Sequence, residues 1–262
     1  MNFEENFDMG EKYYINGEYG KAIEYFENCY EINKSNDCLN YIGCCYLGIK
    51  DYNAAIKIFN SIIEDCPNSE RPVFNLGRAY LKLGEFDTAL DNFEKAITIN
   101  PYSEDGYYYL GVYYQQVGEL EMAKMYYKKS LEIDNKQSET YLNLGICCFE
   151  LKLYEEALEA FSHAYKYDRE CVEAIQNKAL VYIEMKDYER SLKELYAFSI
   201  LEPDDIDNIL DIAHCYYKIH DFKNSYVWCK KALIIDSDNA FANKLLKILS
   251  LKLKNENKNI NL

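Results

Sequence analysis

The fold is decided by a pattern that is clearest in residues 70–103, which read ERPVFNLGRAYLKLGEFDTALDNFEKAITINPYS. Apolar residues recur in two runs at three- and four-residue steps, as they do on one face of an α-helix. Gly84 lies between the runs and suits the left-handed end of the first helix, and Pro101 stops the second because proline has no backbone N–H. Gly77 and Ala89 leave room for the helices to approach closely. The stretch therefore predicts a helix–turn–helix pair.

The same pattern occurs seven times, first at a spacing of 33 residues and then five times at 34. The small residue of the first helix stands at Gly10, Gly43, Gly77, Gly111, Gly145, Ala179 and Ala213. Three residues later come Tyr13, Tyr46, Tyr80, Tyr114, Cys148, Tyr182 and Tyr216. The small residue of the second helix stands at Ala22, Ala55, Ala89, Ala123, Ala157, Ser191 and Ser225. Four residues later in the second helix come Phe26, Phe59, Phe93, Tyr127, Phe161, Leu195 and Cys229. Agreement at four positions indicates a repeat protein.

This unit resembles the tetratricopeptide repeat, whose 34 residues show a small-residue pair, a Tyr and a Phe in the same order. The resemblance covers about residues 3–239. It implies an all-α fold, namely a right-handed α-solenoid of seven helix–turn–helix repeats. The expected repeats are residues 3–35, 36–69, 70–103, 104–137, 138–171, 172–205 and 206–239. In the sixth repeat Lys178 stands where Leu is usual.

A further helix is expected after the seventh repeat, over residues 240–254. Phe241, Leu245, Ile248 and Leu249 form one apolar stripe, but Lys247 sits where the repeat needs a small residue. A repeat array needs a terminal helix with a polar outer face to cover its last apolar surface. We therefore expect a capping helix that completes a single array over residues 3–254, followed by a flexible tail at 255–262.

The chain is acidic, with a net charge of −15. Because a phosphate backbone is bound by clustered Lys and Arg, this composition disfavours nucleic acid and anionic membranes as partners. Residues 1–10 lack the basic flank and apolar run of a secretory signal, and no apolar run of 18 residues predicts a membrane span. We therefore expect a cytoplasmic protein.

Ten cysteines raise the question of a metal or redox site. None forms a Cys-x-x-Cys pair, and the three histidines are not spaced from them as in zinc sites. We expect reduced cysteines that pack as small apolar residues, and a metal or redox role is the open alternative. The nucleophile, zinc-protease and phosphate-loop motifs are also missing, so we expect no catalytic activity and no cofactor.

The resemblance implies that the first helices of the repeats line a concave groove for an extended peptide or helix of another protein. Asn75, Asn143 and Asn177 share one register there, and they resemble groove asparagines that bind partner main chain. An amide side chain offers a donor and an acceptor together, which matches one peptide unit. The alternative is that these asparagines only bind water. The expected groove residues are Phe74, Asn75, Arg78, Tyr108, Tyr109, Val112, Gln115, Leu142, Asn143, Ile146, Phe149, Gln176, Asn177 and Leu180.

The sequence thus predicts a non-catalytic adaptor that holds a partner segment. Phe74, Tyr108 and Tyr109 flank the packed stripe, so they are expected to be exposed contacts for that partner. One alternative is a peptide-sensing regulatory module that acts with a separate effector. Another is a structural subunit that binds through its convex face. Chaperone tails are disfavoured, because Phe7 and Glu11 stand where the family's carboxylate clamp would begin.

Overall fold

The computed structural model describes residues 1–260, with side chains described for residues 1–254. Every regular element in this part of the chain is an α-helix, as the repeat pattern predicts. The sequence predicts one array over residues 3–254, whereas the chain divides into two compact units, residues 1–135 and 136–262. The division falls at the end of the fourth predicted repeat, and each unit is described by itself.

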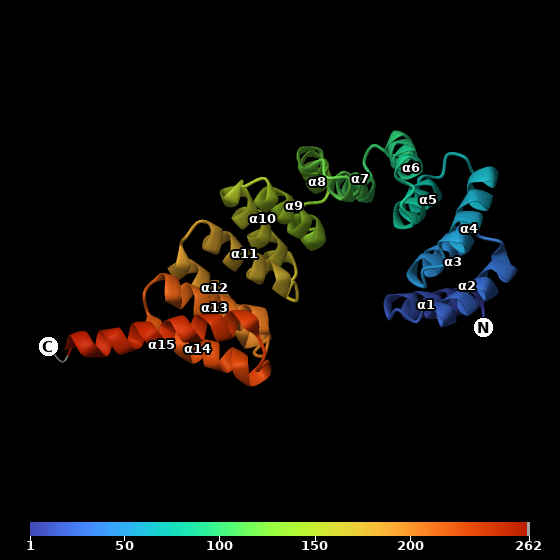
Figure 1. The fold of residues 1–262 in the computed structure, drawn as a ribbon. Coiled ribbons are helices and arrows are strands. Elements are labelled where there is room, and N and C mark those ends of the chain that lie inside the picture. The colour runs from blue at the N-terminus through green and yellow to red at the C-terminus, as the bar shows by residue number, and fades with distance from the viewer. Residues whose placement is uncertain (261–262) are drawn as a thin grey trace. The chain divides into compact units, whose positions relative to one another are not determined.

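The first unit contains four helix pairs, each made of a first helix, A, and a second helix, B (Figure 1). The A helices are α1 (Phe3–Ile15), α3 (Asn36–Gly48), α5 (Glu70–Leu83) and α7 (Glu104–Gln116). The B helices are α2 (Tyr19–Asn33), α4 (Tyr52–Asp65), α6 (Phe86–Ile99) and α8 (Leu120–Ile133). The A helices of neighbouring repeats also touch, α3 with α5 and α5 with α7. Their shared face is therefore a continuous surface within this unit.

The second unit contains three helix pairs and a last helix. Its A helices are α9 (Ser138–Glu150), α11 (Val172–Glu184) and α13 (Ile206–Lys218). Its B helices are α10 (Tyr154–Tyr167), α12 (Tyr188–Leu201) and α14 (Phe222–Ile235). The last helix, α15 (Ala240–Ile260), packs on α14 (Figure 1). It buries Leu245 and Leu249 against Cys229. The helix runs beyond residue 254, where we expected a tail to begin, and the side chains of the expected tail, residues 255–262, lie outside the described residues.

The turn between helices A and B has a left-handed residue at one fixed register in every repeat. Glycine occupies it three times, at Gly17, Gly84 and Gly118. Lys50, Lys152, Lys186 and His220 occupy it in the other four repeats with φ between 61 and 66°. Non-glycine residues pay a modest conformational cost there. The turn geometry is therefore imposed by helix packing rather than by glycine alone.

A ring of helix B fills the space where a side chain of helix A would otherwise lie. A Cβ built on Gly145 would lie 2.5 Å from the ring of Phe161, and one on Gly77 would lie 2.7 Å from that of Phe93. The same close approach occurs at the repeat glycines of the first, second and fourth repeats. Contacts below 3 Å are not tolerated without a shift of the ring. The repeat glycines are therefore required by ring packing.

The sixth and seventh repeats use a different pair of residues at this contact. Ala179 lies in one apolar cluster with Leu195, which stands where other repeats carry the ring. Ala213 likewise packs beside Cys229. The second small residue is serine in both repeats, and its hydroxyl donates to the carbonyl of that alanine. The two bonds are Ser191 Oγ to Ala179 O at 3.1 Å and Ser225 Oγ to Ala213 O at 2.8 Å. A larger residue on helix A is thus matched by a smaller one on helix B.

We expect Gly145→Ala to lower the free energy of unfolding by about 1–2 kcal/mol, because overpacking against Phe161 outweighs the gain in helix propensity. Adding Phe161→Leu, which copies the sixth repeat, should recover part of this loss. Gly20→Ala is the matched control, because open space surrounds Gly20 in helix α2. That variant should gain about 0.5–1 kcal/mol. Urea unfolding of the four proteins checks the expectation, and equal gains at both glycines would contradict it.

Candidate functional site

A hollow of about 350 Å³ opens on the A-helix face of the first unit. Helices α3, α5 and α7 supply most of its lining. Three of the predicted groove residues, Phe74, Asn75 and Arg78, line it together. Asn40 and Tyr41 of α3 also line it, although the sequence analysis did not include them in the groove. Tyr41 stands at the same register as the asparagines, which is the signal that could have placed it there.

Asn75 does not have the open amide that a main-chain clamp needs. Only 4% of the residue is exposed. Its Nδ2 donates to Asn40 Oδ1 at 3.0 Å, and its Oδ1 accepts from Arg78 Nη1 at 3.0 Å. Both functional groups of the amide are therefore engaged inside the protein. Asn75 holds neighbouring side chains in place rather than presenting a free donor and acceptor.

The expectation that Phe74 and Tyr108 are exposed was wrong. Phe74 is 6% exposed and Tyr108 is 8% exposed. The ring of Phe74 packs edge-on against Tyr109 with centroids 5.1 Å apart, and Tyr108 packs against Tyr127 at 5.8 Å. The apolar stripe of a single helix does not predict this burial. For Phe74, the covering ring of Tyr109 comes from the A helix of the next repeat.

The guanidinium of Arg78 is half-buried at the centre of this arrangement. It lies 5.0 Å from the ring centroid of Tyr109 and 5.7 Å from that of Phe74. Val112 and Gln115 lie further along α7 and are also half-buried. Gln115 Oε1 accepts a hydrogen bond from the phenol of Tyr127 at 2.7 Å. The predicted residues of this unit therefore form one connected aromatic and polar surface.

The predicted residues of the second unit lie on two touching A helices, α9 and α11. All seven are half-buried, namely Leu142, Asn143, Ile146, Phe149, Gln176, Asn177 and Leu180. Asn177 Nδ2 donates to the carbonyl of Glu173 in its own helix at 2.9 Å. The carbonyl oxygen of that amide and its second hydrogen remain able to bond a partner. This face is more aliphatic than the A-helix face of the first unit.

Asp211 occupies the asparagine register in the third A helix of this unit, α13. The side chain is half-buried. Burial, together with the nearby carboxylates of Asp207 and Asp205, raises its pKa from the ordinary 3.8 to about 6. An acid of this pKa exchanges its proton near neutral pH. The register thus carries an amide in two repeats of this unit and a titrating carboxyl in the third.

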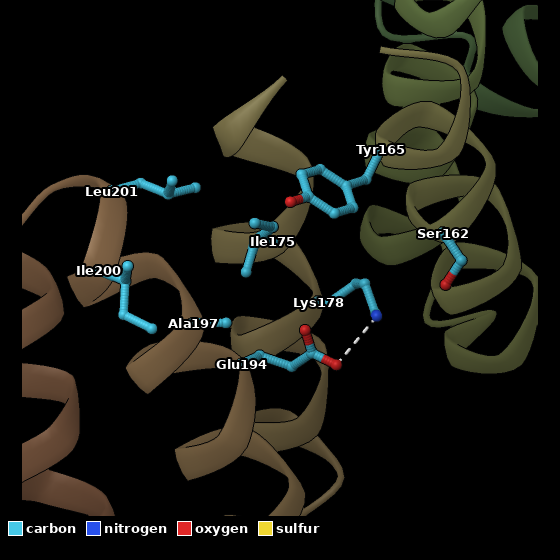
Figure 2. Close-up of a pocket in the computed structure, with 8 residues that line it drawn as sticks. All are labelled: Ser162, Tyr165, Ile175, Lys178, Glu194, Ala197, Ile200 and Leu201. Atoms are coloured by element: carbon cyan, nitrogen blue, oxygen red, sulfur yellow. Dashed lines mark ion pairs between the residues drawn. The ribbon is translucent and has the colours of Figure 1, made fainter. Parts of the chain in front are cut away.

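The hollow described for the second unit lies away from the predicted groove residues. It has a volume of about 370 Å³, and helices α10, α11 and α12 line it. Figure 2 shows Lys178 pointing toward Glu194 across this hollow, where their charged groups form an ion pair at 2.9 Å. Ile200 and Leu201 lie on its α12 side (Figure 2). The unusual lysine of the sixth repeat is therefore matched by an acid on helix B.

The cysteines occupy packing positions of the helices. Eight are buried, Cys44 is half-buried and Cys66 is exposed. Burial raises the pKa of the Cys45 thiol and of the Cys147 thiol to about 12. Within the described residues, His, Cys, Asp and Glu do not gather in groups of three that would suit a metal ion. The open metal or redox alternative gains no support from this packing.

Comparison with known families matches three stretches of the chain. The tetratricopeptide repeat matches residues 102–170, and a second profile described as a TPR repeat matches residues 77–118. Subunit 3 of the anaphase-promoting complex, or cyclosome, matches residues 15–96. No curated relative matches the chain. With the seven-fold register and the helix pairs, these matches show that the chain belongs to the tetratricopeptide-repeat family.

Solved structures share the fold at low sequence identity. A TPR protein from Cytophaga hutchinsonii has a TM-score of 0.70 and 19% identity over 92% of this chain and 99% of its own. YrrB, described as a TPR protein with an unusual peptide-binding site, has a TM-score of 0.66 and 20% identity over 72% of this chain and 97% of its own. A chain of the Cut9–Hcn1 hetero-tetramer of the APC/C has a TM-score of 0.68 and 18% identity over 92% of this chain and 48% of its own. At this identity the likeness shows the fold alone.

The described residues 1–260 contain no helix with the length and apolarity that a membrane crossing requires.

We expect Asp211→Asn to stabilise the protein at pH 8 and to have little effect at pH 4. The folded pKa of about 6 lies above the ordinary 3.8, so the folded state binds this proton more tightly than the unfolded state. The free energy that this tighter proton binding contributes to folding is fully present below about pH 4 and is lost as the pH rises through about 6. The gain at pH 8 should be on the order of 1–2 kcal/mol, since solvent still reaches the carboxyl.

Melting temperatures at the two pH values check this expectation. Asp204→Asn is the matched control, because Asp204 is an exposed residue just before the same helix. A gain at pH 8 that is equal in both variants would contradict the account.

Proposed function

We propose that the chain is a non-catalytic cytoplasmic adaptor that holds a segment of another protein against the A helices of its repeats. The tetratricopeptide fold generally mediates protein–protein interaction, and the family is generally non-catalytic. YrrB, which shares the fold, is described as having a peptide-binding site. The observation that carries the proposal is the row of half-buried amide and aliphatic side chains on the touching helices α9 and α11.

Two features of this row suit an extended peptide. Asn143 and Asn177 stand at the same register of adjacent repeats, so one extended segment can meet both amides. Leu142, Ile146 and Leu180 beside them offer apolar contact while remaining partly exposed. Amides bind peptide main chain without reading side chains, and apolar neighbours then set preference. Such a surface accepts a class of segments rather than a single sequence.

A second candidate is a structural subunit that binds through the outer face of its B helices. Ile200 on α12 and Ile234 on α14 are 82% and 84% exposed. They share one register, at which the first, second, fourth and fifth repeats carry Glu31, Glu64, Glu132 and Lys166. The third repeat carries Thr98 there, so the register is polar in all five other repeats. Isoleucines at a position that is otherwise polar favour a contact there. This face defines the alternative outcome of the binding experiment.

We expect Asn143→Ala to weaken peptide binding about 5- to 100-fold, because it leaves partner main-chain groups without a hydrogen bond. The probe is a 12-residue peptide selected on the wild-type protein from a random phage-displayed library. Calorimetry gives its affinity, and thermal unfolding of each variant shows whether the fold is intact. The melting temperature should change little, since the residue is half-buried rather than part of the core.

Glu159→Ala is the control, because Glu159 is exposed on α10, the B helix paired with α9. Ile200→Asp reports on the outer face. If the peptide binds Asn143→Ala as well as wild type but fails to bind Ile200→Asp, the adaptor proposal fails and the structural-subunit alternative replaces it.

A further inference from the structure

Arg78 stands out among the charged residues of the first unit, because its half-buried guanidinium has only neutral partners. Its Nη1 donates to the amide oxygen of Asn75 at 3.0 Å. The rings of Tyr109 and Phe74 lie 5.0 and 5.7 Å from the guanidinium carbon. In the described part of the chain, no carboxylate forms an ion pair with this arginine.

The ionisable groups that act most strongly on Arg78 are phenols and a thiol rather than carboxylates. They are the phenols of Tyr109 and Tyr14 and the thiol of Cys44. Burial raises the pKa of Tyr14 to about 12 and that of Cys44 to about 11. Both groups therefore stay protonated over the physiological range and cannot serve as counter-ions. The guanidinium, which remains charged at all accessible pH values, has no anion beside it.

A partly desolvated cation without a counter-ion carries a free-energy cost that ring contacts only partly offset. A guanidinium has five N–H donors in a planar fork, and such a fork binds a carboxylate through two parallel hydrogen bonds. Asn75 occupies one donor and fixes the orientation of the side chain. The side chain of Tyr109 is a further hydrogen-bond partner of Arg78. Arg78 also lines the hollow of about 350 Å³, so a ligand in the hollow can meet the donors that these two partners leave.

We propose that Arg78 binds an Asp or Glu side chain of a partner segment that lies on the A helices of the first unit. The inference rests on the proposed function and specifies the partner's chemistry. Asn40 and Asn100 line other parts of the same hollow. Their amide oxygens accept from Asn75 Nδ2 and from the backbone N–H of Tyr102, and their Nδ2 groups suit the carbonyls of main chain that runs past Arg78. The occupant is therefore a side chain of a continuous segment rather than a chain-terminal carboxylate.

A phosphate group fits this hollow poorly. Glu70, Glu104 and Asp105 line it together with Arg71 and Arg78. The three carboxylates repel a dianion more strongly than a single carboxylate. Residues 1–135 carry 23 acidic and 12 basic side chains, so the field of the whole unit acts in the same direction. With two arginines and three carboxylates in its lining, the hollow favours one added negative charge over two.

The test uses a phage library of 12 random residues whose C-termini are fused to the coat protein, so that no free terminal carboxylate is present. The library is selected separately on wild type, on Arg78→Gln and on Lys82→Gln. Lys82 is exposed one turn further along α5, so its variant makes the same change in net charge. We expect an Asp or Glu at one fixed position of the peptides from wild type and Lys82→Gln, and loss of that preference with Arg78→Gln.

A synthetic amidated peptide from the wild-type selection then tests the pairing directly. Replacing its acid by the amide should weaken binding to wild type at least 10-fold and should have no effect on Arg78→Gln. Arg78→Lys, which keeps the charge without the fork, should give an intermediate loss. Melting temperatures must stay close to wild type, since a folding defect would weaken binding of all peptides alike.

Four results would overturn the inference. Peptides without an acidic position whose binding still depends on Asn143 would remove the role of Arg78 and leave the adaptor proposal standing. A gain in affinity on replacing the acid by phosphoserine would identify a phosphate site. Tight binding that requires a free C-terminus would assign the site to a chain end. Selection of no peptide at all would contradict the adaptor proposal and this inference together.

Discussion

The contact between a helix A glycine and a helix B ring is the constraint on which the rest of the structure depends. The ring of Phe161 occupies the volume that a side chain on Gly145 would take, and the same holds in four other repeats. This close approach fixes the rotation of helix A against helix B. Once that rotation is set, the positions two before and one after the glycine necessarily turn away from the ring. These are the positions of Asn143 and Ile146.

The sixth and seventh repeats show that the constraint concerns volume rather than a particular residue. Alanine replaces glycine in both, and leucine or cysteine replaces the ring. Serine on helix B then bonds the alanine carbonyl, which supplies a directional link where the ring contact is weaker. The left-handed turn residues behave in the same way, because lysine or histidine adopts the conformation wherever glycine is missing. Packing of the helix pair therefore governs local geometry throughout the repeats.

The helices and the left-handed turn at Gly84 followed from the sequence, because they depend on periodicity and on short-range sterics. The burial of Phe74 did not, since its second neighbour, Tyr109, belongs to the next repeat. The sequence also predicts that Asn75 binds a partner, because the register does not reveal its hydrogen bond to Asn40. Asn40 lies 35 residues away, in the preceding repeat. Lys178 departs from the repeat pattern, and its ion pair with Glu194 of the paired helix accounts for this departure. Contacts between repeats depend on side-chain directions that a register alone does not give.

The two units present different chemistry on their A helices. The first unit offers a caged arginine among aromatic rings, and the second offers amides among aliphatic side chains. Amide contacts to main chain supply affinity that tolerates sequence variation, whereas a desolvated charge pair supplies selectivity. Both surfaces are built from the same repeat pattern, and they differ in the residues that stand at fixed registers of helix A.

The central claim is that a partner segment lies on the A helices and not on the outer face of the B helices. Photo-crosslinking tests this most directly, with a benzophenone amino acid placed singly at Leu180 of α11 or at Ile200 of α12. Both residues lie in the sixth repeat and are accessible to solvent. The account predicts that a selected peptide crosslinks at position 180 and not at 200. Crosslinking at 200 with none at 180 would contradict it.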